Sequence, residues 1–324
     1  MSAARESRVG ARLWRANGLL LFASFIWGMG FIAQSLGASG MGPFSFNALR
    51  FALGGLSLLA ALPLIRRFEP AVPGGVKELV LAGLAAGAAL FAGSSLQTAG
   101  LLYTLPGKAG FITGLYVVIV PLLGLFWRQK TGPLVWLGCA LAVVGLYFLS
   151  VSGDFRLSFG DALILAGAFC WAVHVQIIGY FSRRVDPIRI AVVQFLVTAA
   201  LSLAAGLFFE RPSAAAVIAT LPAVLFGGLL SVGVAFTLQV VGQKDTHPGH
   251  AALIMVSEAM FAVLGGWLVM GERLGARELA GCGLMLAGML LAVAAPYLQR
   301  APRAEAPAHS AELELETQVP AVEL

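Results

Sequence analysis

Charged side chains are scarce in this chain. They make up 11% of its 324 residues, whereas about a quarter of the residues in a soluble domain are charged. Hydrophobic residues account for 59%, and the mean hydropathy is +0.88. This composition excludes an ordinary soluble domain and predicts an integral membrane protein. The 21 lysines and arginines outnumber the 16 acidic residues, but they gather at the ends of apolar runs. We therefore interpret them as a topology signal and not as a nucleic-acid surface.

Cysteines are few, and the motifs of catalysis are missing. Cys139, Cys170 and Cys282 lie inside apolar runs without the spacing of metal ligands, which favours small buried side chains over disulfides or a metal site. The sequence has no GxxxxGKS or GxxxxGKT loop, no HExxH, no GxSxG and no pair of carboxylates in an apolar run. We therefore expect neither an enzyme nor a nucleotide-driven pump, and no cofactor or metal. The function left by these exclusions is movement of a solute down its own gradient or coupled to the gradient of an ion.

An internal repeat organises the chain. The stretch LQTAGLLYTLPGKA, Leu96–Ala109, returns 142 positions later as LQVVGQKDTHPGHA, Leu238–Ala251. At an offset of 144, Trp27 corresponds to Trp171. Further matches follow in the same order along both halves, with slips the size of short loop insertions. This pattern indicates that the chain is a duplication of one unit.

Ten apolar runs are long enough to cross a membrane as helices. A hydrocarbon core about 30 Å thick needs roughly 20 apolar residues of helix. The runs lack the alternation of barrel strands, so the expected fold class is an all-α integral membrane protein with ten transmembrane helices. The runs are Gly18–Leu36, Pro43–Ile65, Leu79–Leu102, Ala109–Trp127, Leu134–Val151, Ala162–Phe181, Ile188–Phe209, Ala214–Val241, Ala251–Met270 and Leu279–Ala295.

The two repeats are expected to have opposite orientations. Each contains five runs, an odd number, and no further run separates them, so they form two inverted five-helix repeats. Basic residues are concentrated in the segments that would then be cytoplasmic, which indicates that both termini are cytoplasmic. The expected location is a bacterial inner (plasma) membrane. The expected organisation is a basic cytoplasmic N-terminus (1–16), a first repeat (17–151), a periplasmic connector (152–160), a second repeat (161–295) and a disordered acidic cytoplasmic tail (296–324).

Three stretches carry a resemblance to a known family. They are RFAL around Arg50, AGFITGLYVVIVPLLGL in the fourth run, and SEAMFAVLGGWLVMGERLGARELAGCGLMLAGMLL near the end of the second half. From Asn17 to Ala295 the chain resembles the EamA-type transporters of the drug/metabolite transporter superfamily. The resemblance implies a secondary carrier of small metabolites, with export of amino acids or related compounds by alternating access. Ala259 departs from the family, which usually has a helix-kinking proline after the glutamate equivalent to Glu258.

Ionisable residues inside membrane spans are costly and are therefore candidates for function. Glu258 in the ninth run and Arg50 in the second have opposite charges. They either pair with each other, or Glu258 carries a proton while Arg50 meets a substrate carboxylate. His174, in the sixth run, is the other candidate for proton coupling because imidazole titrates near neutral pH. The alternatives are structural: an ion pair or snorkelling to the interface for Arg50, a neutral hydrogen-bond donor between helices for Glu258, and a hydrogen-bonded packing residue for His174.

Repeat-related polar and aromatic residues are candidates for the walls of a cavity. Gln97 and Gln239 are repeat mates, and such pairs can face a shared site at the membrane midplane. Trp27, Trp171 and Tyr116 stand in mid-run, away from the interfaces where aromatic belts gather. Together they would suit a partly apolar, partly polar solute. Helix packing and hydrogen bonding between helices are the alternative uses of these side chains.

The expected partners are a small-molecule substrate and the lipid bilayer, without nucleic acid, for a monomer or a homodimer. Two other functions stay open. The same superfamily includes nucleotide-sugar and lipid-linked carriers, for which Arg50 would be the one buried cation able to meet a phosphate. A protein of another class, a membrane sensor or scaffold, would act through the acidic tail.

Overall fold

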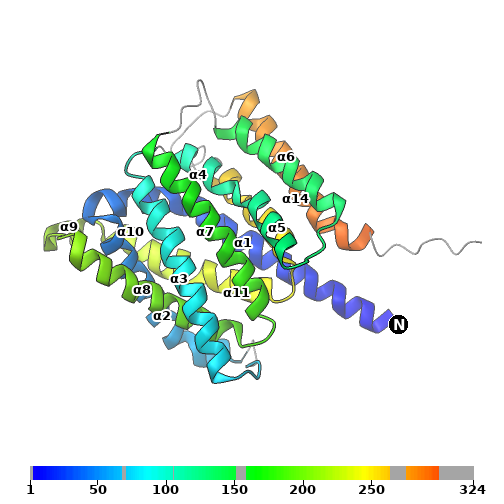
Figure 1. Cartoon of the computed structure of the whole chain (residues 1–324), viewed down its shortest axis with the longest axis horizontal. Helices are drawn as coiled ribbons and strands as arrows, with labels where there is room; N and C mark the ends of the chain where they lie inside the picture. The colour runs from blue at the N-terminus through cyan, green and yellow to red at the C-terminus, as the bar shows by residue number, and fades with distance from the viewer. Residues whose placement is uncertain (1–2, 68–70, 105, 151–157, 263–274, 299–324) are drawn as a thin grey trace, which may run out of the picture.

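The computed structural model describes residues 3–67, 71–104, 106–150, 158–262 and 275–298, and these form helices joined by short connections (Figure 1). Most of the expected connector and almost all of the expected tail lie outside the described residues. The helices are α1 (Ala3–Met41), α2 (Pro43–Ile65), α3 (Val76–Gly100), α4 (Pro106–Gly114), α5 (Tyr116–Phe126), α6 (Pro133–Ser150), α7 (Phe159–Phe181), α8 (Pro187–Phe209), α9 (Ala214–Ala219), α10 (Leu221–Leu225), the π-helix η1 (Phe226–Phe236), α11 (Thr237–Gln243), α12 (Pro248–Met255) and α14 (Ala276–Leu298).

Eight stretches in the described part of the chain are long and apolar enough to cross a membrane. The expectation of an all-helical membrane protein is therefore confirmed. The fifth expected run forms α6, whose apolar part Pro133–Phe148 is described in full, and the ninth is described only as far as residue 262. The first helix is longer than its apolar run, because α1 continues back through the basic N-terminal segment as far as Ala3.

Two runs that were expected as single helices are interrupted. Leu115 separates α4 from α5, and Val256 with Ser257 separates α12 from a helical segment that starts at residue 258. At each break the amide of Leu115 or Ser257 donates to the carbonyl three residues earlier, at 3.2 Å in both cases, which is the tighter 3₁₀ pattern. The breaks lie at equivalent positions of the two repeats. The second forms with Ala259 in place of the family's proline, so it does not depend on that residue.

The eighth expected run is also divided, into α9, α10, η1 and α11. Its central part is an 11-residue π-helix. Wide helical turns of this kind are rare in proteins and are frequent at functional sites. Hydropathy could not indicate where α10 passes into η1, because the residues on both sides of that point, Leu225 and Phe226, are apolar.

Helix α2 packs against α8, its equivalent in the other repeat. Ser45 near the start of α2 lies against Gly206 near the end of α8, so the two helices are antiparallel. Between these ends the ring of Phe51 lies 6.3 Å from that of Phe195, which is its own repeat mate. Direct contact between mates is expected where equivalent helices cross at a local two-fold axis.

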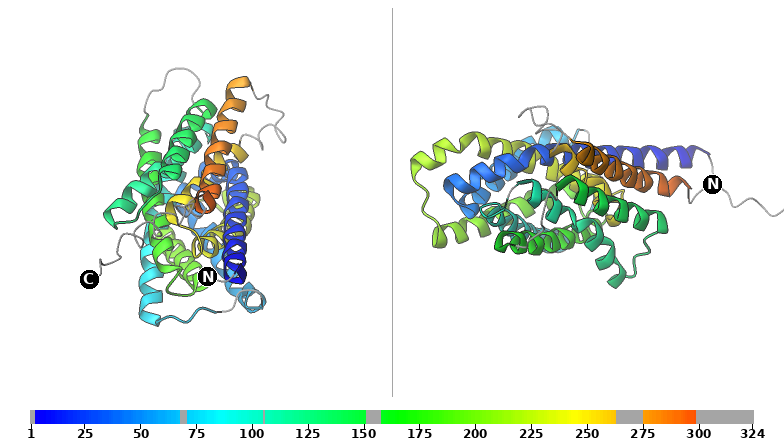
Figure 2. Two further views of the ribbon diagram at one scale, coloured as in Figure 1. Left: turned by 90° about the vertical axis from the view of Figure 1, so that its right-hand side faces the viewer. Right: turned by 90° about the horizontal axis from the view of Figure 1, so that it is seen from above.

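Helices α6 and α14 are a second equivalent pair and lie side by side (Figures 1 and 2). Gly138 and Gly288 are in close contact. A Cβ atom on Gly138 would lie 2.8 Å from the carbonyl oxygen of Gly288, and a Cβ atom on Gly288 would lie 2.6 Å from that of Gly138. Gly145 meets Gly281 in the same way, with a Cβ-to-carbonyl distance of 2.7 Å. Small residues allow this close approach of helices. The two contacts are repeat equivalents of each other, again in an antiparallel arrangement.

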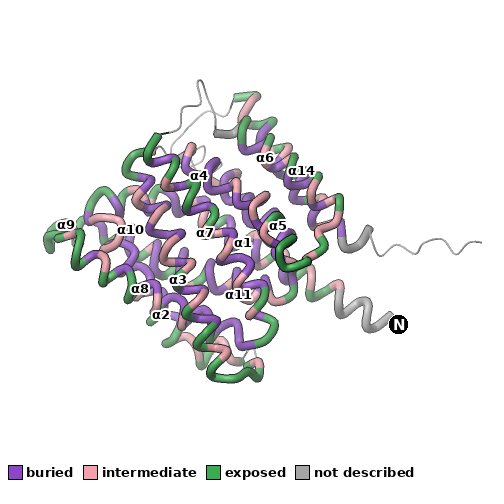
Figure 3. Tube along the Cα trace, in the orientation of Figure 1, coloured by how far each residue is buried: buried purple, intermediate pink, exposed green. Residues whose placement is uncertain are grey.

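Helices α1 and α7 occupy equivalent places near the centre of the bundle. α7 packs along α3, and α1 packs along η1 and α11, which correspond to α3 in the second repeat. Figure 3 shows buried positions along these central helices and exposed positions at the periphery, for example along α9. The centre of the bundle is therefore built from elements of both halves.

Asp186 joins α2 to α8 at one end of the bundle. Its carboxylate pairs with Arg66 at 2.9 Å and accepts hydrogen bonds from the backbone N–H groups of Val72 (3.0 Å) and Arg189 (2.9 Å), the latter as the N-cap of α8. Burial alone would raise the pKa of this carboxyl group. The hydrogen bonds from Arg66 and the two backbone amides outweigh burial and lower the pKa below its ordinary value.

Replacing Asp186 by asparagine is expected to lower the melting temperature of the detergent-purified protein by a few °C at neutral pH. A carboxyl group with a lowered pKa stabilises the fold above its unfolded pKa of about 4, and this contribution is lost as the pH falls through the folded value. The deficit of the variant should therefore shrink below about pH 4. Melting curves at about pH 7 and about pH 3.5 check this. An equal deficit at both would contradict it.

Candidate functional site

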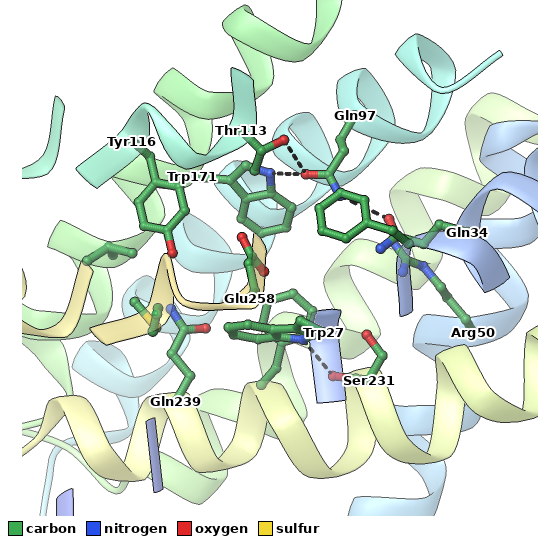
Figure 4. Close-up of a pocket in the computed structure, with 14 residues that line it drawn as sticks. Trp27, Gln34, Arg50, Gln97, Thr113, Tyr116, Trp171, Ser231, Gln239 and Glu258 are labelled. Atoms are coloured by element: carbon green, nitrogen blue, oxygen red, sulfur yellow. Dashed lines mark hydrogen bonds between the residues drawn. The ribbon is translucent and has the colours of Figure 1, made fainter. Parts of the chain in front are cut away.

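A cavity lies between the two halves of the bundle, with about 530 Å³ of space free of protein atoms when the open solvent at its mouth is included. Its wall comes from α1, α2, α3, α4, α5, α7, η1, α11, α12 and the segment that starts at residue 258. Both polar and aromatic side chains line it (Figure 4). The lining residues are Trp27, Phe31, Gln34, Arg50, Gln97, Thr113, Tyr116, Trp171, Val175, Ser231, Phe236, Gln239, Met255 and Glu258.

The lining contains repeat mates from both halves. Trp27 and Trp171 form one such pair and Gln97 and Gln239 another, while Tyr116 is equivalent to Glu258. Tyr116 and Glu258 are each the first residue after a helix break. Seven of the eight candidate residues from the sequence are thus brought together around one cavity.

Arg50 stands at one side of the cavity and is only 2% exposed. Its Nε donates to Oδ1 of Asn47 at 2.9 Å, and its guanidinium lies 5.2 Å from the ring centre of Phe46 and 4.9 Å from that of Phe51. Figure 4 shows the guanidinium turned toward the cavity beside Gln34. Aromatic rings and one amide therefore hold the cation and leave its terminal nitrogens facing inward.

Gln97, on the same side as Arg50, is the centre of a hydrogen-bond network. Its Oε1 accepts from Nε1 of Trp171 at 2.8 Å and from Oγ1 of Thr113 at 3.4 Å, and its Nε2 donates to Oε1 of Gln34 at 3.0 Å. The network ties α3 to α1, α4 and α7. The Gln97 amide oxygen is thus fully used by the protein itself.

Glu258, Tyr116 and Gln239 lie together on the opposite side of the cavity from Arg50 (Figure 4). Glu258 is 7% exposed, and its carboxylate points toward Trp171. Gln239 donates from Nε2 to Oε1 of Gln243 at 3.0 Å, while its own Oε1 is buried without a hydrogen-bond partner among the described residues. This side of the cavity therefore presents hydrogen-bond acceptors.

His174 is the candidate that does not line the cavity. It is completely buried, with one ring nitrogen, Nε2, 2.9 Å from Oε1 of Gln194 and Nδ1 without a partner in the part of the chain that the structure describes. Its ring meets those of Trp171 and Phe236 edge-on at 6.1 and 6.2 Å. It therefore stands one layer behind the cavity wall.

The structure does not join Arg50 to Glu258. Among the described residues no ion pair links them, although the sequence left such a pair open. The two opposite charges instead face the same cavity from different sides. They are the two charged side chains among the described lining residues.

Several lining residues were missed by the sequence reasoning. Gln34, Thr113 and Ser231 are single polar residues in apolar runs, and Phe31 and Phe236 look like any other apolar residues in lipid-embedded helices. The available signal for Gln34 and Thr113 was the cost of an isolated polar group in a membrane span. The two phenylalanines had no such signal.

The two halves bond their equivalent tryptophans differently. Trp171 donates to Gln97, but Trp27 donates from Nε1 to the backbone carbonyl of Ser231 in η1 at 3.2 Å. Gln239, the mate of Gln97, is left with its buried Oε1 unpartnered within the described chain. One molecule thus contains two different arrangements of the same repeated residues.

Comparison with known proteins gives consistent matches over nearly the whole chain. The model of the EamA-like transporter family matches residues 14–151 and 158–294. An uncharacterized transporter of Archaeoglobus fulgidus is 31% identical over 285 residues, which cover 86% of each chain. The uncharacterized inner membrane transporter YedA of Escherichia coli K12 is 26% identical, over 86% of this chain and 90% of the relative. A protein of known crystal structure has the same fold, with a TM-score of 0.70 and 22% identity over 88% of this chain and 99% of that one.

Proposed function

Because the chain belongs to the EamA-like transporter family and is a multi-pass membrane transporter rather than an enzyme, we propose that it exports a small metabolite by alternating access. The cargo class is an amino acid or a related compound, as the resemblance to EamA-type exporters implies. A location in a bacterial inner membrane is supported by the relative YedA, whose name places that protein there.

The proposed architecture is ten transmembrane helices in two inverted repeats, 17–151 and 161–295, between a cytoplasmic N-terminal segment and a cytoplasmic tail. The antiparallel packing of α2 on α8 and of α6 on α14 supports it. Equivalent helices that cross antiparallel at a local two-fold axis require that axis to be perpendicular to them. For membrane-spanning helices such an axis lies in the membrane plane, which is the geometry of an inverted repeat.

One observation carries the proposal of alternating access, namely the unequal bonding of the repeated tryptophans around one cavity. Inverted halves with equivalent sequences can exchange their arrangements when the transporter passes to its other state. In that state we expect Trp27 to donate to Gln239 and Trp171 to release Gln97. The cavity would then be remodelled without any change in its lining residues.

Coupling to protons is assigned to Glu258 or His174. Glu258 faces the cavity directly after a helix break, where a small backbone movement would change its surroundings. His174 connects α7 to α8 through Gln194 and touches two aromatic residues of the cavity wall. Each position lets a change of charge act on the cavity.

Purified protein in liposomes is expected to take up one or more labelled amino acids saturably, with accumulation that follows an imposed pH gradient. Glu258→Gln and His174→Gln variants locate the coupling, since glutamine preserves hydrogen bonding but does not titrate in this range. Loss of the pH dependence in one variant identifies the proton site. Unchanged transport by both variants across the pH series would remove proton coupling, and saturable exchange without a pH effect would indicate a facilitator. If folded protein takes up no amino acid and instead transports or binds nucleotide sugars or lipids, the assignment of amino acids as the cargo is wrong.

A further inference from the structure

We propose, on the basis of this transport function, that the cavity binds a zwitterion in one orientation, with its carboxylate on Arg50 and its ammonium group on the acceptors around Glu258. The proposal starts from the separation of charge across the cavity. Arg50 and Glu258 face it from different sides, and no ion pair joins them among the described residues. Since an unpaired charge in a membrane interior is costly, a ligand that carries both complementary charges would relieve both costs at once.

The side of Arg50 is suited to a carboxylate. The hydrogen bond to Asn47 and the rings of Phe46 and Phe51 fix the guanidinium in place, and its terminal nitrogens face the cavity. The fork of N–H groups on a guanidinium matches the two oxygens of a carboxylate. A phosphate, with higher charge, generally draws on several donors, and Arg50 is the one cation among the described lining residues.

The opposite side is suited to an ammonium group. The Glu258 carboxylate and the unpartnered Oε1 of Gln239 are both acceptors, and the Tyr116 hydroxyl lies beside them. An ammonium group has three donors and no acceptor, which is the complement of this set. The neighbouring faces of Trp27 and Trp171 add the attraction of aromatic rings for cations.

The buried Oε1 of Gln239 is the sharpest single indication. A buried acceptor without a partner is destabilising, and its repeat mate on Gln97 has two partners. Gln239 therefore has an acceptor left over where Gln97 has none. A ligand N–H group in the cavity would satisfy it.

The rest of the wall indicates an uncharged side chain on the ligand. Phe31, Val175, Phe236 and Met255 line the cavity without adding charge. L-leucine is therefore a suitable probe. Two analogues isolate its charged groups, because isopentylamine lacks the carboxylate and 4-methylpentanoate lacks the amine.

Equilibrium binding of labelled L-leucine to the detergent-purified protein tests the proposal, with each analogue as a competitor. Leucine is expected to displace the label at concentrations at least about tenfold lower than either analogue, as expected for a loss of roughly one strong polar contact. Arg50→Gln should weaken leucine and 4-methylpentanoate but leave competition by isopentylamine unchanged. Gln239→Leu and Glu258→Gln should weaken leucine and isopentylamine but not 4-methylpentanoate. Gln239→Glu, which adds a negative charge at the same place, should strengthen isopentylamine.

Arg189→Gln and Glu78→Gln, near helix ends away from the lining, control for the loss of one charge, and a monodisperse elution profile establishes that each variant is folded. The proposed orientation of the zwitterion would be wrong if leucine and both analogues competed equally well. It would also be wrong if each variant lost the same affinity for both analogues. If liposomes transport an analogue and the protein does not bind leucine, the proposal that the cavity binds a zwitterion is wrong, while the proposal that the protein is a carrier still holds. If none of the three compounds is bound or transported, this result contradicts both the zwitterion site and the proposed cargo class.

Discussion

Replacing Lys108 by methionine is expected to lower the melting temperature of the purified protein by roughly 5 °C. Lys108 Nζ lies 2.5 Å from the carboxylate of Asp161, whose side chain has no exposed surface. That carboxylate also accepts from Oγ1 of Thr104 at 2.8 Å and from the backbone N–H of Ser158 at 2.6 Å, within the capping box of α7. Removing one partner of a buried ion pair typically costs about 3–5 kcal/mol. The remaining hydrogen bonds and the partial exposure of Lys108 reduce this to about 2–3 kcal/mol.

The double variant Lys108→Met with Asp161→Asn separates the charge effect from the loss of contacts. It should recover part of the lost stability, because the buried carboxylate without its cation is the main cost in the single variant. Lys77→Met, which removes an exposed lysine at the start of α3, controls for the change in net charge. A single variant as stable as this control would show that the Lys108–Asp161 pair does not hold α4 to α7.

Gly28→Ala is expected to impair transport and leucine binding by about tenfold, whereas Gly30→Ala, two residues further along α1, should be close to wild type. A Cβ atom on Gly28 would lie 2.6 Å from the carbonyl oxygen of Glu258 and 2.7 and 2.8 Å from Phe261 Cβ and Ala262 N. Backbone atoms cannot rotate away, so the segment that carries Glu258 would have to shift. Overpacking of this kind costs about 1–3 kcal/mol.

The comparison between the two glycines isolates the steric effect. Both stand in the middle of α1, so alanine raises helix propensity by a similar amount, about 1 kcal/mol, at each. A Cβ on Gly30 would meet only a ring carbon of Phe226, at 3.4 Å. Transport rates and melting curves of both variants check the prediction. Equal behaviour would mean that α1 and the Glu258 segment adjust to each other freely.

The membrane class, the duplication and most of the candidate site residues could be predicted from the sequence alone. The scarcity of charge identified a membrane protein, and the return of Leu96–Ala109 at Leu238–Ala251 identified the duplication. Candidates such as Trp27, Trp171, Gln97 and Gln239 could be chosen because polar and aromatic residues are conspicuous in apolar spans, and because a repeat assigns each a mate. These arguments depend on composition and order, which a sequence contains completely.

The tertiary structure was needed to decide which side chains share a cavity and where helices break. In a membrane helix the face toward lipid and the face toward protein are both apolar, so periodicity does not tell Phe31 and Phe236 from lipid-facing residues. The break at Leu115 lies inside an apolar run, so hydropathy does not mark it, and the polar residues Ser257 and Glu258 at the second break do not by themselves indicate a helix end. Whether Trp171 bonds Gln97 while Trp27 bonds Ser231 depends on how two halves of equivalent sequence are packed against each other. The sequence by itself determined the class, the repeat and the candidate residues. The packing of one half on the other decided the cavity and its unequal bonding, because similar local patterns can adopt two arrangements that only long-range contacts distinguish.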